Sequence, residues 1–514
     1  MDRRHFLHLT GGSGLAALLS ACGGGGGSSP TPVPPPPPPS GLVSGGVDFG
    51  PLASQLQGSV VVPTSASFDS TRLLANTLYD NIKPTAIVRC ASAGDVQAAL
   101  AFVQAKKLAV TARCGGHSWA GYSTTTGVVL NVTAMNGVTA NGDGTATIGA
   151  GARLAEVYSG LIAQGVCIPS GTCPTVGIAG ITMGGGIGVL DRKYGLTCDN
   201  LVSADIVTVD GVLRTCSATS EPDLFWAIRG GGGGNFGIAT SFTYRTHATQ
   251  DITVAHANFA MADFATVFKA WQVWPQSLPD EIWAQIYVGI YQGSAYFTLT
   301  TWCLGTASDL TPTWNAFLAS LSATPLSTNG LAPAVVQQSY HDVALGNCAT
   351  GTLTQCSLQD YSTGGTVQRY AEVLSSDYFS QPIPDAGIQK LVDSATTLAA
   401  GNGVGSYIFD HMGGALGRVA SDATAFPHRN ALFSVEYAVS DIGGYPYNPA
   451  WANSMRGVMS AWSTGGAYVN YLDPMLANWQ SAYYGANYAR LQQIKKVYDP
   501  NRVLTMAQGI VPAA

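Results

Sequence analysis

Charged residues are scarce in this chain of 514 residues: Asp, Glu, Lys and Arg together make up 11%, against about 25% in ordinary soluble proteins. Hydrophobic residues make up 46%, so the sequence predicts a folded protein with a large core. A basic surface is also missing, because the formal net charge is −6, and nucleic acid is not an expected partner. The length exceeds the roughly 250–300 residues of a single core and predicts two domains.

Closely spaced cysteine pairs are absent. Ten Cys are present, none in a Cys-x-x-Cys arrangement, so no metal site is expected. Exported chains can form disulfides. Cys348 and Cys356 flank a Gly/Thr-rich loop and are the best candidate pair, while buried free thiols are expected for most of the others.

The N-terminus lacks a long hydrophobic run. The apolar stretch Leu15–Leu19 is too short to cross a bilayer. It follows Arg3-Arg4, which resembles a twin-arginine export signal, and precedes Leu19-Ser20-Ala21-Cys22, which resembles a lipobox. We therefore assign residues 1–22 to a signal and expect a periplasmic or cell-surface protein, with a lipid anchor at Cys22. A plain cleaved signal is the alternative.

Glycine and proline are abundant instead, and they help to divide the chain. Residues 23–50 are rich in Gly, Ser and Pro, a composition typical of a linker. Three segments are expected after it: a first domain at 51–249 with its core at about 80–249, a second at 250–475, and a C-terminal segment at 476–514.

Hydrophobic periodicity predicts an α+β fold. Residues 82–245 alternate between strand and helix patterns, with Ser92 as a helix N-cap and a hairpin over 201–216. Residues 250–475 carry long aromatic and β-branched runs, such as Ile282–Ile290, that predict one broad sheet with helices between its strands. The last segment is expected to be helical, with one face formed by Tyr488, Leu491, Ile494 and Val497.

Three glycine-containing motifs follow one another in the first domain. They are Arg113 to Ser118 (Arg-Cys-Gly-Gly-His-Ser), Gly171 to Gly188 (beginning Gly-Thr-Cys-Pro-Thr-Val-Gly), and Gly230 to Ile238, which opens with five Gly. Each alone could be a turn. Three in order favour a backbone that lies close against a flat ring and a phosphate group.

This order of motifs resembles that of the berberine bridge enzyme-like flavoproteins, which have the vanillyl-alcohol oxidase or PCMH-type FAD-binding fold. The resemblance extends to Asp191-Arg192-Lys193-Tyr194-Gly195, to Tyr468-Val469-Asn470-Tyr471, and to the segment Tyr483 to Leu491. It covers roughly residues 60–512. It implies a two-domain fold in which a second α+β domain, a large antiparallel sheet covered by helices, holds the substrate.

The resemblance also implies an FAD bound through two covalent bonds. His117 would bond the 8α-methyl carbon and Cys173 the C6 position, and both are suitable nucleophiles. Ile238 would contact the adenine side, and Val176 lies where a small side chain admits oxygen, which favours an oxidase. The other residues expected at the cofactor are Arg113, Cys114, Gly115, Gly116, Ser118, Gly177, Gly180, Gly184, Gly188, Gly237 and Asn487.

Hydride transfer from a C–H bond to a flavin requires removal of the neighbouring O–H proton. Tyr471 matches a family position often used as this base, provided that a nearby cation lowers its pKa. Glu436 is the second candidate. An aromatic packing role for Tyr471 and a structural role for Glu436 are the alternatives. A regular strand over residues 468–471 would place Tyr468 and Tyr471 on opposite faces.

The sequence thus predicts an exported oxidase that converts a C–OH group, of a carbohydrate or another alcohol, to a carbonyl while O2 becomes H2O2. Trp271, Trp274 and Trp302 could stack on sugars or belong to the core. The alternatives are a dehydrogenase that reduces a membrane electron carrier, an enzyme of secondary metabolism, and a non-catalytic surface lipoprotein.

Overall fold

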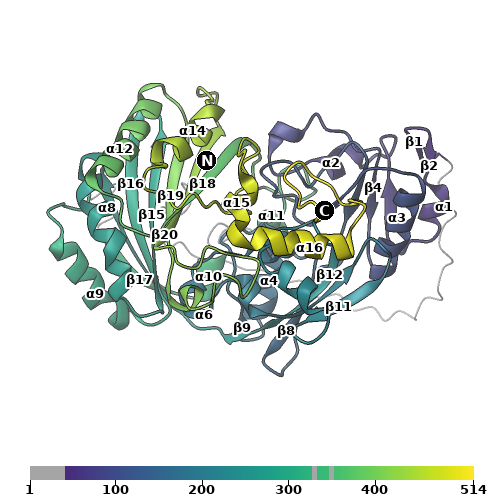
Figure 1. Ribbon diagram of the computed structural model, residues 1–514. Coiled ribbons are helices and arrows are strands. Elements are labelled where there is room, and N and C mark those ends of the chain that lie inside the picture. Colours follow the sequence, from purple (N-terminus) through teal and green to yellow (C-terminus); the bar gives the residue numbers. More distant parts are fainter. Residues whose placement is uncertain (1–40, 327–332, 346–351) are drawn as a thin grey trace, which may run out of the picture.

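The structure is a computed structural model that describes residues 41–326, 333–345 and 352–514 (Figure 1). It divides into an N-terminal lobe, residues 41–248, a sheet lobe, residues 252–459, and a C-terminal segment, residues 467–514. The predicted signal, the lipid site at Cys22 and Cys348 lie outside the described residues. None of the described helices has the length and apolar character to cross a membrane. Cys356 is disulfide-bonded, and the remaining described cysteines are free thiols.

Two sheets build most of the N-terminal lobe. In the first, three strands run parallel and one antiparallel, in the order β3 (Ser59–Val61), β4 (Ala86–Arg89), β6 (Val128–Asn131), β5 (Val110–Arg113). The second is antiparallel, in the order β11 (Leu213–Ser217), β10 (Leu201–Val207), β12 (Ile238–Arg245), β8 (Thr145–Gly149), β7 (Val138–Ala140). The hairpin predicted over 201–216 is the β10–β11 pair.

Short helices and small strand pairs complete this lobe. Helix α3 (Ala93–Ala105) begins at Ser92, whose hydroxyl accepts from the Asp95 N–H at 3.2 Å, as the sequence predicts. The other elements are β1 (Val43–Ser44), β2 (Val47–Asp48), α1 (Gly50–Ala53), α2 (Phe68–Arg72), α4 (Leu154–Ile162), β9 (Val166–Cys167), α5 (Ile178–Gly184), α6 (Asp191–Tyr194), α7 (Pro222–Ala227) and β13 (His247–Ala248).

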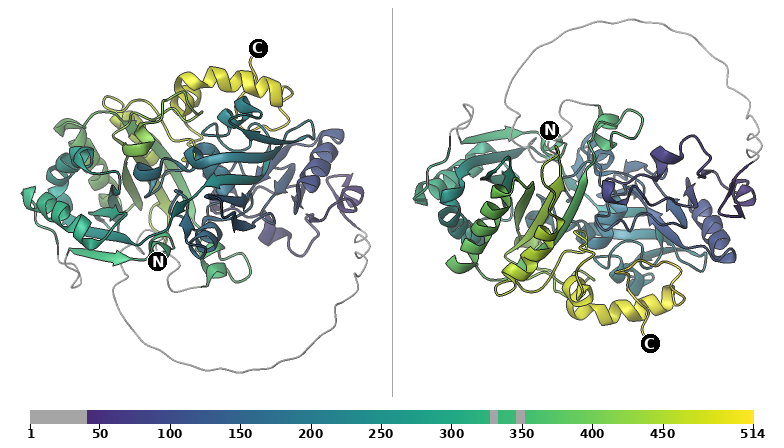
Figure 2. Two further views of the ribbon diagram at one scale, coloured as in Figure 1. Left: turned by 90° about the horizontal axis from the view of Figure 1, so that it is seen from below. Right: turned by 90° about the horizontal axis from the view of Figure 1, so that it is seen from above.

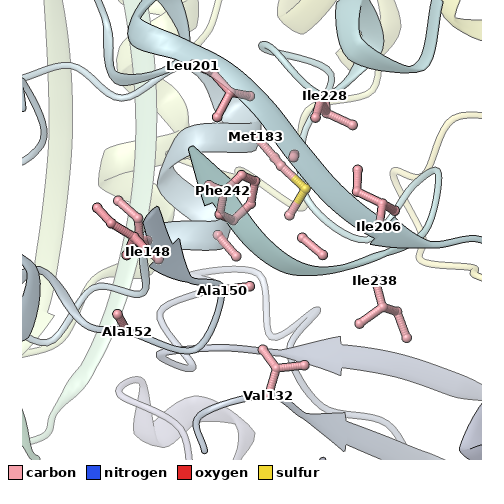
Figure 3. Close-up of a cluster of buried hydrophobic side chains, with 14 of the residues drawn as sticks. Val132, Ile148, Ala150, Ala152, Met183, Leu201, Ile206, Ile228, Ile238 and Phe242 are labelled. Atoms are coloured by element: carbon pink, nitrogen blue, oxygen red, sulfur yellow. The ribbon is translucent and has the colours of Figure 1, made fainter. Parts of the chain in front are cut away.

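Side chains of β8, β10, β12 and α5 meet in the core of the N-terminal lobe, where Phe242 and Met183 lie between Ile148 and Ile206 in the view of Figure 3. Met183 and Ile238 belong to this core and also line the cavity described below. The cavity wall on this side is therefore continuous with the packed interior.

One antiparallel sheet of seven strands spans the sheet lobe, as predicted. Its order is β17 (Ala334–Gln338), β14 (Ile252–Ala260), β16 (Ser294–Cys303), β15 (Ile282–Tyr291), β19 (Gly405–His411), β20 (Phe433–Asp441), β18 (Ala371–Phe379). Helices α8 (Phe264–Val273), α9 (Ala307–Ser320), α12 (Asp385–Ala400) and α14 (Pro449–Met459) cover the side away from the N-terminal lobe (Figure 1). Shorter helices are α10 (Tyr340–Ala344), α11 (Leu353–Ser357) and α13 (Gly414–Gly417).

The two faces of this sheet differ in composition because successive side chains of a strand point to opposite faces. Tyr407, Phe409, Val435 and Tyr437 pack in the apolar core beneath the helices. Ile408, Asp410, Glu436 and, on β15, Gln285 alternate with that apolar set and line the cavity. We call the cavity-lining side of this sheet the polar face; it consists of Trp283, Gln285 and Tyr287 on β15, Trp302 on β16, Glu372 on β18, Ile408 and Asp410 on β19, and Glu436 on β20.

The C-terminal segment returns to the N-terminal lobe. Helices α15 (Trp479–Tyr484) and α16 (Tyr488–Tyr498) lie along that lobe in both views of Figure 2. Leu491 and Ile494 are buried there, as predicted, but Val497 is 71% exposed, so its assignment to the buried face is wrong. With 3.6 residues per turn, three successive steps of three residues carry Val497 to the side of the helix opposite Tyr488, and the buried face continues at Lys495 instead.

Candidate functional site

A cavity of about 380 Å³ lies between the N-terminal lobe and the polar face, a size typical of small-molecule sites. The three glycine-containing motifs form its wall on the N-terminal side. Residues 468–472 of the C-terminal segment also line it. The cavity is therefore built from all three parts of the chain.

The first motif begins where β5 ends, and all of residues 113–118 line the cavity. The guanidinium of Arg113 donates to the carbonyl oxygens of Thr71, Arg72 and Ser123 at 2.7–3.1 Å. Burial lowers its pKa to about 10. Arg113 thus holds neighbouring loops, and its charge is not directed at a ligand.

The two predicted attachment residues line the same cavity. His117 Nε2 lies 2.6 Å from the Thr175 hydroxyl oxygen, and Cys173 lies two residues before Thr175. The Val176 N–H donates to the Cys173 carbonyl at 3.1 Å, which makes the tight turn that brings both residues to the wall. Cys114 and Ser118 also line the wall, and Ser118 accepts from the Tyr122 N–H at 2.9 Å.

Most of the predicted cofactor glycines are needed for contacts between chain segments. A Cβ at Gly188 would lie 1.9 Å from the Ser170 carbonyl oxygen, and one at Gly237 would lie 2.5 Å from Ile206. Gly115, Gly116 and Gly177 also line the cavity with their backbones. At Gly180, by contrast, a Cβ would meet nothing within 4 Å, so this residue leaves open space at the cavity.

Two predicted cofactor residues do not line the cavity. Gly184 packs against Asn470, since a Cβ there would lie 2.0 Å from the amide oxygen. Asn487 donates from its side chain to the carbonyl oxygens of Ser421 and Thr424 at 2.7 and 3.2 Å. Asn487, in the 3-10 turn that precedes helix α16, therefore holds the loop before β20. Ile238, at the start of β12, does line the cavity.

The polar face opposite places carboxyl groups at the cavity. Glu436 on β20 was predicted, but Asp410 and Glu372 were not. Ile408 pairs with Glu436 across β19 and β20, so Asp410 is the diagonal neighbour of Glu436 on the same face. Burial raises the pKa of Asp410 to about 7; a hydrogen bond from Gln285 at 2.8 Å opposes this rise and Glu436 adds to it. The alternation of Ile408-Phe409-Asp410 was the available signal, but it did not reveal the partner strand.

Tyr471 also lines the cavity, although not as predicted. Residues 468–471 form a turn, closed by the Tyr471 N–H and the Tyr468 carbonyl at 2.9 Å, rather than a strand. Both tyrosines therefore reach the same side, with ring centroids 4.9 Å apart. The Tyr468 hydroxyl accepts from the N–H groups of Gly186 and Ile187, so it ties this turn to the second motif.

The expected cation near Tyr471 is not found. Burial raises the pKa of Tyr471 well above its usual value, and Glu436 and Asp410 raise it further. Among the described residues, the main groups that shift the pKa of Tyr471 include no Lys or Arg. Tyr471 is thus a protonated hydroxyl in the protein alone, while the pKa of the neighbouring Asp410 is raised to about 7.

The tryptophans divide between core and cavity. Trp271 is fully buried in the sheet-lobe core, and Trp274 stacks on Phe317 with ring centroids 4.1 Å apart. Trp302 and Trp283 line the cavity with centroids 5.0 Å apart. The indole N–H of Trp283 is buried and has no hydrogen-bond acceptor among the described residues. Such an orphan donor is expected where a ligand completes the site.

The chemistry of the wall fits an FAD. Two nucleophilic side chains, His117 and Cys173, line the cavity together with helix α5, whose backbone is exposed at Gly180, and the Trp283 indole N–H lacks an acceptor among the described residues. Within the described ranges no cluster of His, Cys, Asp and Glu is arranged to hold a metal ion. The site thus has the donor set of a flavin pocket.

Comparison with known proteins agrees. The family of FAD binding domains matches residues 84–217, and the family "Berberine and berberine like" matches residues 467–511. The FAD-linked oxidoreductase YgaK of Bacillus subtilis is 31% identical over 467 residues, covering 89% of this chain and 98% of YgaK. The structure of Physcomitrella patens BBE-like 1 superposes with a TM-score of 0.82 at 29% identity, covering 91% of this chain and all of the moss protein.

The fold is the PCMH-type FAD-binding fold, and its site is that of a flavoprotein. The chain belongs to the berberine bridge enzyme-like family of FAD-linked oxidoreductases. The solved structure of a Phl p 4 variant with valine in place of isoleucine, described as a glucose oxidase, is similar to this chain at 26% identity with a TM-score of 0.77. The match covers 88% of this chain and 97% of Phl p 4.

Proposed function

We propose that this protein is an oxidase that holds FAD through His117 and Cys173 and oxidises a C–OH group of a small molecule, with O2 reduced to H2O2. One observation carries the proposal: both nucleophiles line one wall of a cavity whose opposite wall bears the Asp410 and Glu436 carboxyl groups. The FAD, when bound, supplies the hydride acceptor.

The carboxyl pair is the proposed proton acceptor. Asp410 titrates near pH 7 because it is buried beside Glu436, and a general base functions best with a pKa near the working pH. Tyr471 keeps its proton and donates a hydrogen bond that orients the substrate oxygen. Glu436 adds to the raised pKa of Asp410, so proton uptake at Asp410 depends on the charge of its neighbour.

Val176 supports the assignment as an oxidase. It lines the cavity three residues after Cys173, and the family resemblance gives small side chains there the role of admitting oxygen. The glucose oxidase activity described for the Phl p 4 variant makes sugars the first substrates to examine, and Trp302 offers a surface for a sugar ring.

Export, lipid anchoring at Cys22, and the segment limits 51–249, 250–475 and 476–514 are part of this proposal. A twin-arginine signal suits a protein that receives its covalent cofactor before export. Mass spectrometry of the membrane fraction tests the anchor: a lipid-modified Cys22 as the first residue supports it, and a soluble chain cleaved elsewhere contradicts it.

A substrate panel scored for H2O2 tests the activity. We expect peroxide in stoichiometric amounts with at least one sugar, polyol or aromatic alcohol. Turnover with an artificial acceptor but without peroxide under air would identify a dehydrogenase instead. Denatured protein should keep its flavin; release of all flavin on denaturation would contradict the covalent attachment.

A further inference from the structure

The loops that carry His117 and Cys173 touch each other through their backbones. A Cβ at Gly115 would lie 2.5 Å from the Gly177 nitrogen and 2.7 Å from the Thr175 carbonyl oxygen. A Cβ at Gly177 would lie 2.4 Å from the Gly115 nitrogen and 2.2 Å from the Cys114 sulfur. Neither position has room for a side chain, so the contact fixes the separation of the two loops.

Thr175 adds a polar contact across this junction. Its hydroxyl oxygen lies 2.6 Å from His117 Nε2, and the residue is 1% exposed. The Trp119 ring stands edge-on to the imidazole, with centroids 5.6 Å apart at 90°. A part-buried hydrogen bond on one side and an aromatic ring on another limit rotation of the imidazole.

We propose that Thr175 is a positioning residue for the covalent attachment of the flavin to His117. Its hydroxyl holds the imidazole in the orientation in which a ring nitrogen meets the 8α carbon. The inference rests on the proposed attachment of FAD through His117 and Cys173. We expect Thr175 to affect only the bond between His117 and the flavin. Its hydroxyl is hydrogen-bonded to His117, whereas the Cys173 thiol reacts at a different carbon of the flavin.

The attachment step needs an oriented nucleophile. A ring nitrogen of His117 forms a bond to the 8α carbon, while the methyl group and the imidazole each lose a proton. The electron pair passes to the flavin ring system, and O2 takes it up to give H2O2, so one C–N bond is gained for one O2 consumed. An imidazole free to rotate would meet the carbon less often.

The test removes the Cys173 bond so that His117 is the remaining link. In the Cys173→Ala background, Thr175→Val deletes the hydroxyl at nearly constant shape, Thr175→Ser keeps the hydroxyl, and Thr175→Ala repeats the loss with a smaller side chain. Flavin bound before and after denaturation is measured by absorbance. Mass spectrometry of the peptide that contains His117 shows whether the flavin is attached to it. We expect Thr175→Val and Thr175→Ala to lower the His117-linked flavin about tenfold, and Thr175→Ser to retain it.

A matched series in the His117→Ala background separates positioning from folding. There Thr175→Val should leave the Cys173-linked flavin unchanged. The inference is overturned if Thr175→Val keeps the His117-linked flavin at the parent level, or if it lowers both linkages alike. If the protein without any substitution releases all of its flavin on denaturation, the proposed covalent attachment itself is wrong. That outcome is distinct from a failure of the role proposed for Thr175.

Discussion

The two walls of the cavity are built in different ways. The N-terminal wall consists of short contiguous motifs, in which residues 113–118 and 171–188 each contribute several lining residues. The polar face consists of single side chains from β15, β16, β18, β19 and β20, each separated from the next by an apolar residue. In the proposed function the first wall holds the FAD and the second meets the substrate, and a position on the second wall can be replaced without changing its neighbours along the strand.

If the walls have separate tasks, removing the carboxyl pair should abolish turnover and keep the flavin. We expect the double variant Asp410→Asn, Glu436→Gln to lose about 10²–10⁴-fold in kcat, the usual contribution of a general base. Flavin absorbance of the denatured protein should stay at the parent level. Asp385→Asn, on the outer helix α12 in an exposed ion pair with Lys269, is the control. Loss of flavin in the double variant would show that the walls are not independent.

The N-terminal wall should depend on the C-terminal segment behind it. Lys495 and Asp499 form a fully buried ion pair at 2.6 Å, and Lys495 also donates to the Asn235 carbonyl within the third motif. Breaking a buried pair from one side costs about 3–5 kcal/mol, so Lys495→Met should lower the free energy of unfolding by that amount in urea titrations. The adjacent exposed Lys496→Met should change it by less than about 0.5 kcal/mol. If Lys495→Met and Lys496→Met lowered the free energy of unfolding equally, the buried ion pair would not be what stabilises this wall.

Replacing glycines of the same wall with Ala should destabilise the protein by different amounts, depending on what the added Cβ would contact. Gly115→Ala forces a methyl group against the Gly177 backbone and should lower the free energy of unfolding by about 1–3 kcal/mol. Gly180→Ala meets open space and should cost less than that, although it can hinder the cofactor. Thermal unfolding of the two variants without bound flavin measures the contrast. A larger loss for Gly180→Ala would mean that the segment contact is not what requires Gly115.

The polar face should give the protein its pH dependence. Because burial raises the pKa of Asp410 to about 7, kcat/KM should fall about tenfold per pH unit below pH 7 and level off above it. The folded protein also keeps a proton that the unfolded chain, with a carboxyl pKa of 3.8, releases. The stability that this provides is full below about pH 4 and is lost as the pH rises through 7. Asp410→Asn should remove this stability slope, and an unchanged slope would exclude Asp410 as its source.

The sequence by itself determined the N-terminal wall. Gly-Gly-His and Thr-Cys-Pro-Thr are local patterns, and a local pattern keeps its meaning because its residues stay neighbours after folding. These motifs predicted that His117, Cys173 and Val176 lie at the cofactor site, and all three line the cavity. In the same way, the alternation in residues 282–290 predicted a strand of the broad sheet. Gly184 and Asn487 were misplaced because the resemblance gave their position along the chain but not the segments packed against them.

Only the tertiary structure decided the polar face. Asp410 and Glu436 are 26 residues apart in the chain, and they become neighbours because β19 pairs with β20 in one register. A shift by one residue would have turned Asp410 into the apolar core. The turn at 468–471, which brings Tyr471 beside this pair, likewise depends on the Tyr468 hydroxyl bonding to the backbone of residues 186–187. Pairings between distant segments set these positions, and no local spacing encodes them.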